Sequence, residues 1–93
     1  MDAPTHFQPN QQGTMFDVTA LHDASTLCRI LSLFTVNGLL LDAINAISLA
    51  GGMQRIQLSC PEISPQRAEI LKAKIGQIIT VQSSQIARLA IAA

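Results

Sequence analysis

The residues of this chain best suited to chemistry are His22 and Asp23, which stand side by side between two apolar stretches. A histidine next to a carboxylate could exchange protons near neutral pH, because its side chain titrates in that range. Catalysis would also need a nucleophile and an orienting group within reach of the pair, and this loop offers no such set. The simpler interpretation is that His22 is a solvated loop residue and that Asp23, or else Ser25, caps a helix. We therefore expect no catalytic residues.

The two cysteines, Cys28 and Cys60, are the next candidates. They could form one disulfide, but apolar neighbours and the lack of a secretory signal favour reduced and buried thiols. A structural zinc site needs four ligands at close spacing, and His6 and His22 are far from both cysteines in the sequence. The sequence therefore predicts no metal and no cofactor. Arg29 is expected at the surface or at the rim of a dimer interface.

The charge balance bears on possible partners. Six Lys and Arg against six Asp and Glu give a formal net charge of zero, and there are three Phe but no Trp or Tyr. Nucleic-acid binding needs a basic surface or aromatic stacking platforms, so we expect no nucleic acid. No apolar run approaches the roughly 20 residues that span a bilayer, and the N-terminus does not resemble a signal peptide. We expect no membrane partner and a cytoplasmic location.

The composition points to association instead. The chain has 93 residues, enough for one small domain with one core. Charged residues make up 13% of it and hydrophobic residues 48%, whereas charged residues are about 25% of an ordinary soluble domain. Apolar surface in excess of what one small core can bury favours an oligomer.

The stretch 23–41 organises the rest of the chain. It combines two candidate N-caps, an apolar helix predicted over residues 26–36, and a stop at Asn37-Gly38, where left-handed backbone is expected. One stripe of this helix has the spacing i, i+3, i+4, i+7 of a buried face: Leu27, Ile30, Leu31 and Phe34. Leu33 and Val36 lie off the stripe and need some other cover.

Strands and a second helix are expected around it. Alternating residues predict strands over 15–21 and 54–60, and an apolar run predicts one over 39–49. Gly51-Gly52 is typical of a two-residue hairpin turn. Ser64-Pro65 predicts the start of an amphipathic helix, in which Glu69 and Lys72 pair. A weaker strand follows over 79–87.

This order, strand, helix, strand, strand, helix, strand, predicts an α+β fold of the ferredoxin-like βαββαβ type. Right-handed crossovers would place two helices on one face of a four-stranded antiparallel sheet. We expect a flexible N-terminal arm over residues 1–13, a domain over 14–89 and a short tail over 90–93. The fold hosts many unrelated functions, so it does not by itself define one.

Several segments together resemble the ACT domain, above all that of the small regulatory subunit of acetolactate synthase. They are the Leu-Cys-Arg-Ile-Leu-Ser-Leu-Phe run of residues 27–34, Asn37-Gly38-Leu39, the strand 41–47 and the run 75–81. The resemblance implies a non-catalytic regulatory domain that senses an amino acid, or a regulatory subunit of an enzyme of branched-chain amino-acid biosynthesis. The alternative is a ligand-free structural or dimerisation module of the same fold.

In the resembling subunits an amino acid binds where the first loop meets the second strand of a partner chain. Carried over, this implies an effector site made by a loop, a helix N-terminus and one strand residue: His22, Asp23, Ala24, Ser25, Thr26, Leu27 and Leu40. Where the family has Asn and Gly in the loop and Asn early in the strand, this chain has His22, Ser25 and Leu40. Backbone N–H groups at the helix N-terminus could still hold the carboxylate of the ligand.

A homodimer is the expected assembly. The strand 39–49 is uncharged except for Asp42 and lies at a sheet edge in this topology, where an unprotected edge invites pairing. Two-fold pairing would give eight strands and bring the first helices together. The predicted interface residues belong to that strand and helix: Leu33, Val36, Leu39, Leu41, Ala43 and Asn45. A catalytic subunit and a free amino acid are the other expected partners.

Overall fold

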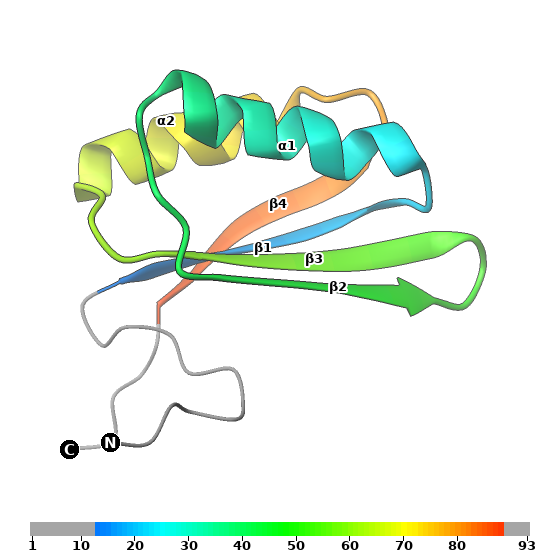
Figure 1. Cartoon of the computed structure of the whole chain (residues 1–93). Coiled ribbons are helices and arrows are strands. Elements are labelled where there is room, and N and C mark those ends of the chain that lie inside the picture. Colours follow the sequence, from blue (N-terminus) through cyan, green and yellow to red (C-terminus); the bar gives the residue numbers. More distant parts are fainter. Residues whose placement is uncertain (1–12, 89–93) are drawn as a thin grey trace, which may run out of the picture.

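The computed structural model describes residues 13–88 as an antiparallel sheet under two helices (Figure 1). Along the chain the elements are β1 (Thr14–Leu21), α1 (Ala24–Val36), β2 (Ala43–Leu49), β3 (Met53–Cys60), α2 (Pro65–Gly76) and β4 (Val81–Arg88). The predicted arm over 1–13 and the tail over 90–93 fall outside the described residues, apart from residue 13.

The strand order is β2-β3-β1-β4, and every neighbouring pair is antiparallel. Both helices lie on one face of the sheet, which leaves the other face open (Figure 1). The hydroxyl of Ser84 in β4 donates to the carbonyl of Lys72 in α2 (3.0 Å). This contact places α2 over the β4 side, and α1 occupies the side of β2 and β3. The predicted ferredoxin-like α+β fold is confirmed.

Helix α1 begins two residues earlier than predicted, because Asp23 rather than Ser25 is its N-cap. The Asp23 backbone is extended (φ −126°, ψ 129°), and its carboxylate accepts from the backbone N–H of Ser25. At the other end Gly38 has a φ of 67°, as the stop signal predicts, whereas Asn37 (φ −90°, ψ 5°) is not left-handed. Gly38 alone therefore supplies the left-handed backbone at which the chain turns after α1.

The second strand is shorter than predicted. It begins at Ala43, and residues 39–42 form a connection whose backbone is bonded elsewhere. The N–H of Leu39 donates to the carbonyl of Phe34 (2.9 Å), and that of Asp42 to the carbonyl of Ser59 (3.0 Å). Leu39 and Leu41 pack half-buried against the core. Apolar side chains in this stretch therefore mark a connection packed on the core rather than four more strand residues.

The second helix follows the sequence signals, and the hairpin follows them in part. Gly51 and Gly52 both have positive φ (76° and 71°), but the last strand pair is Leu49 with Met53, so the loop has three residues, 50–52, instead of the predicted two. Ser64 caps α2 through Arg67 N–H, with Pro65 in the first turn. The expected pair also forms, with 2.9 Å between Lys72 Nζ and Glu69 Oε1. The last strand starts at Val81 rather than at residue 79.

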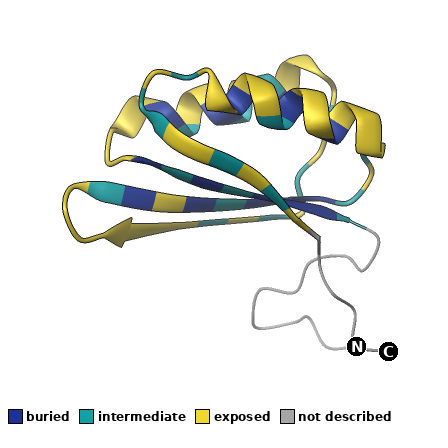
Figure 2. Ribbon diagram, turned by 180° about the vertical axis from the view of Figure 1, so that it is seen from behind, coloured by how far each residue is buried: buried dark blue, intermediate teal, exposed yellow. Residues whose placement is uncertain are grey.

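The core lies between the sheet and the helices. Phe16 of β1 and Phe34 of α1 meet edge to face, with ring centroids 5.2 Å apart and planes at 85°. Around them pack other buried residues of the sheet and of both helices: Val18, Ala20, Ile30, Ile56, Leu58, Cys60, Ala68, Leu71 and Ile75. Figure 2 shows burial concentrated on β1, β3 and the inner sides of the helices, whereas β2 is largely exposed. The second strand is the least protected element of the described fold.

The cysteines differ from each other. Both thiols are free, and Cys60 is buried, but Cys28 is exposed on α1, so the expectation of two buried thiols is wrong for Cys28. Burial raises the pKa of the Cys60 thiol above its ordinary value. In the described part of the chain, neither helix is both long and apolar enough to cross a membrane.

Candidate functional site

The first loop joins β1 to α1 and is held by backbone hydrogen bonds at the end of the sheet. The N–H of Leu21 donates to the carbonyl of Thr80 (2.9 Å), and the N–H of His22 donates to the carbonyl of Gly52 (2.8 Å). Residues 21–25 are nonetheless exposed. The loop is therefore a fixed and accessible platform.

A buried glutamine that the sequence did not single out also supports this loop. Gln54 is 7% exposed, and its side-chain amide donates to the carbonyls of Leu21 (2.8 Å) and Asp23 (3.3 Å). Its spacing of two from Ile56 and four from Leu58 was the signal that it shares their inner face.

Thr26 links the first loop to Thr80, the residue just before β4. Its hydroxyl shares a hydrogen bond of 2.6 Å with that of Thr80, and its side chain is fully buried. Thr26 was predicted to contact an effector, but in the structure its side chain faces inward and is satisfied within the chain. It therefore acts as a support for the loop.

Asp23 lies at the N-terminus of α1, where a ligand carboxylate was expected to bind. Its Oδ1 accepts from both the backbone N–H and the hydroxyl of Ser25, each at 2.8 Å. These bonds, aided by Arg29, lower the pKa of Asp23, so the group is ionised at neutral pH. A second carboxylate at this position would meet a like charge. The loop therefore favours a cationic group over an anionic one.

Leu40 is far from this loop within one chain. It is 82% exposed in the connection 39–42, at the opposite end of α1, and 13 residues of helix separate the two, or about 20 Å. The chain thus brings together residues 22–27 but leaves Leu40 apart. A site containing both would need a second copy.

The outer edge of β2 is the second candidate surface. Register with β3 puts Ile44 on the helix side, opposite Leu58, and Ile47 and Leu49 on the open side, opposite Arg55 and Met53. These three β2 side chains are 40–47% exposed. The strand contains neither a charged residue nor a proline, the devices that usually protect an edge. The predicted interface residues Ala43 and Asn45 are half-buried on its open side.

Leu33 and Val36, which were predicted to lie in a dimer interface, are on the side of α1 that faces α2. Leu33 lines a shallow hollow with Lys74 of α2 and with Gln77, the C-cap of that helix. At 100° per residue, Val36 falls on that same side, and Leu27 and Leu31 fall on the side toward β2. The apolar part of α1 next to the β2 edge is therefore Leu27 and Leu31.

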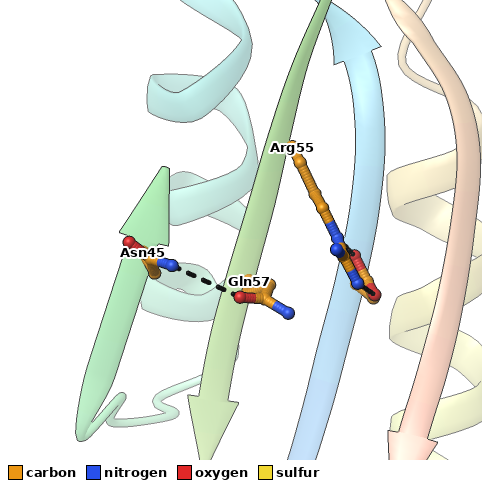
Figure 3. Close-up of polar contacts among 4 residues, drawn as sticks. Asn45, Arg55 and Gln57 are labelled. Atoms are coloured by element: carbon orange, nitrogen blue, oxygen red, sulfur yellow. Dashed lines mark hydrogen bonds and ion pairs between the residues drawn. The ribbon is translucent and has the colours of Figure 1, made fainter. Parts of the chain in front are cut away.

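The open face of the sheet is polar in its centre (Figure 3). Arg55 donates to both carboxylate oxygens of Asp17, at 3.0 and 2.6 Å. Asn45 Nδ2 donates to Gln57 Oε1 across β2 and β3 (3.3 Å). These groups satisfy one another. Among residues 13–88 there is also no group of three or more His, Cys, Asp or Glu that could hold a metal ion.

These features define a small α+β domain with an exposed first loop and an unprotected apolar sheet edge. The sequence matches the family of ACT-like domains over residues 8–92, and the chain therefore belongs to the ACT-like domain family. A comparison with curated protein sequences finds no match.

Solved structures agree on the fold. The ACT domain of GTP pyrophosphokinase from Chlorobium tepidum is 9% identical, with a TM-score of 0.69 over 81% of this chain and 96% of that one. The C-terminal domain of the MgtC protein from Mycobacterium tuberculosis is 13% identical, with a TM-score of 0.72 over 95% and 98%. An uncharacterised Thermotoga maritima protein is 14% identical, with a TM-score of 0.65 over 84% and 96%. At these identities the likeness shows the fold alone.

Proposed function

We propose that this ACT-like domain is a non-catalytic regulatory module that works as a homodimer joined through β2. The observation that carries the proposal is the β2 edge, which exposes Ile44, Ile47 and Leu49 on both sides of a backbone edge that no other strand among residues 13–88 pairs with. Pairing of two such edges would form an eight-stranded sheet. The adjacent Leu27 and Leu31 would meet their counterparts across the two-fold axis.

The other edge of the sheet supports this choice. Strand β4 carries a polar run from Gln82 to Gln85, which suits an edge that faces water. Strand β2 has no such protection. The exposed large apolar side chains of the two edge strands are on β2, so β2 gains more apolar burial when it pairs.

In this dimer an amino-acid effector would lie between the first loop of one copy and residues 39–42 of the other. Because Asp23 is ionised and only its Oδ1 carries the internal bonds, we orient the effector with its ammonium group on that carboxylate. This reverses the orientation expected from the sequence. The regulated enzyme would be one of amino-acid biosynthesis, with an acetolactate synthase catalytic subunit as the partner that the sequence resemblance favours.

Sedimentation velocity tests the dimer. Wild-type chain should sediment as a dimer at micromolar concentration, because each buried isoleucine contributes about 1.5 to 3 kcal/mol before ordering costs. The double variant Ile44→Asp/Ile47→Asp should sediment as a monomer with an unchanged circular dichroism spectrum. A wild-type monomer of 10.0 kDa at that concentration would refute the proposal.

Thermal-shift titration with the twenty amino acids tests the effector. A ligand at 100 times its dissociation constant adds about 2.7 kcal/mol of stability. Asp23→Asn should abolish the shift while it keeps a capping side chain. No shift with any amino acid at millimolar concentration would leave the ligand-free dimerisation module as the function of this fold.

A further inference from the structure

A groove runs along the surface between α1 and α2, on the side of α1 away from β2. Near the end of α1 a hollow of about 100 Å³ is lined by Asn37, Leu39, Arg67, Ile70, Leu71 and Lys74. Towards its beginning a shallower hollow of about 390 Å³ is lined by Arg29, Leu33, Lys74, Gln77, Ile78 and Ile79. Lys74 lines both, so the two hollows adjoin, and we call them together the groove.

Helical spacing gives the groove its straight walls. Arg29, Leu33 and Asn37 are four residues apart, so they share one side of α1 and its cap. Arg67, Ile70 and Lys74 follow at three and four residues along α2. The eight-residue separation of Arg29 and Asn37 corresponds to about 12 Å, or about two helical turns.

The groove combines exposed and half-buried apolar side chains with positive charge. Ile70 is 58% exposed and Ile79 is 89% exposed, while Leu33, Leu39 and Ile78 are half-buried. Three cations surround them: Arg29, Arg67 and Lys74. Neither lining contains a carboxylate.

The groove cations form no close ion pair within the described residues. The ion pairs among residues 13–88 are Arg55–Asp17 and Lys72–Glu69. Arg29 interacts with the Asp23 carboxylate through space only. Arg67 donates one N–H to the carbonyl of Asn37 (3.0 Å), which fixes its position at the end of the groove. In a chain of zero net charge, three unpaired cations around exposed isoleucines form a local positive surface.

We propose that this groove is a docking site for a short acidic amphipathic helix of another protein. The apolar stripe of such a helix would contact the isoleucine and leucine side chains of the groove. Glu or Asp side chains beside that stripe would pair with the cations of α1 and α2. A site of this length buries too little surface for a permanent complex, which fits a transient regulatory contact. The groove lies on the α2 side of α1, so dimerisation through β2 leaves it open. The proposal stands whether or not the dimer or an amino-acid effector exists.

Two synthetic peptides of about 15 residues serve as probes, long enough to present two turns when bound. Both carry leucines at i, i+3, i+4 and i+7. One has Glu at the flanking positions, and the other has Lys. Fluorescence anisotropy at low salt should show the Glu peptide binding roughly tenfold or more tightly than the Lys peptide, with affinity that falls as salt is added.

Charge reversal in the groove provides the second arm. Lys74→Glu should lower the affinity for the Glu peptide and raise the affinity for the Lys peptide. Lys72→Glu is the matched control, since Lys72 lies on the same helix but outside the groove, and it should leave both affinities within about twofold. Circular dichroism verifies that both variants fold. The proposal is wrong if wild-type protein binds the two peptides equally, if it binds neither at about 1 mM, or if both lysine variants have the same effect.

Discussion

At the scale of single residues, Asp23 ties local structure to acid stability. Its folded pKa is lowered by the hydrogen bonds from Ser25 and by Arg29. A carboxyl with a lowered pKa stabilises the fold above its ordinary pKa of about 4, and this contribution is lost as the pH falls through the folded value. Asp23 is therefore one source of acid sensitivity.

Asp23→Asn should flatten the acid limb of the stability profile. The amide still accepts the cap hydrogen bonds but does not titrate. Urea unfolding at pH 7 and at pH 3 should show a smaller loss of stability for the variant than for the wild type. Equal losses would mean that Asp23 does not contribute to the pH dependence.

Thr26 is the second residue whose environment makes a prediction. Thr26→Val removes one partner of the Thr26–Thr80 hydrogen bond at nearly constant volume. It should cost about 0.5 to 1.5 kcal/mol, the usual net value of such a bond. In the double variant Thr26→Val/Thr80→Val the loss should be smaller than the sum of the single losses. Additive losses in urea unfolding would show that the hydroxyls do not interact.

At the scale of elements, the β2–β3 turn depends on backbone that only glycine adopts easily. Gly52→Ala should cost about 1 to 2 kcal/mol, because φ is 71° there. Gly76→Ala is the matched control: it lies in α2, without positive φ, and an added Cβ would meet Ser84 Cβ at an ordinary 3.8 Å. It should be neutral or stabilising by up to about 1 kcal/mol. Similar destabilisation by both would contradict the turn assignment.

The sequence predicted the type and order of every element because the signals were local. Caps, the Gly-Gly turn and the two periodicities each depend on a few adjacent residues. The limits of β2 could not be predicted in this way, since Leu39 and Leu41 are as apolar as strand residues. The N–H of Leu39 instead bonds to the end of α1 at Phe34, and the N–H of Asp42 bonds to Ser59. Leu39 and Leu41 also pack against the core, so the boundary depends in part on contacts that are distant in the sequence.

The candidate site was less predictable than the fold. The exposed loop was expected, but the role of Gln54 as its inner support is set by strand register with β1. Leu33 and Val36 were rightly separated from the buried stripe of α1. The sequence alone did not show which element lies beside them. In the structure Leu33 faces α2.

At the scale of the whole molecule, the described domain has one well-covered half and one exposed half. Strands β1 and β3 are buried between neighbours, while β2 has a partner on one side only. Small domains are marginally stable, because they bury a smaller share of their surface. Covering β2 with a second copy would therefore add stability to the fold as well as define the assembly.

The stability of a β2-paired dimer should depend on protein concentration. If unfolding is coupled to dissociation of a β2-paired dimer, the thermal midpoint should rise with concentration, and each tenfold increase is equivalent to about 1.4 kcal/mol. Ile44→Asp/Ile47→Asp should unfold at a lower midpoint that does not change with concentration. Val36→Asp is the matched control, since Val36 is 79% exposed on the α2 side of α1, and it should retain the wild-type dependence. If Val36→Asp abolishes the dependence and the β2 variant keeps it, the copies meet through the helices instead of the sheet edge.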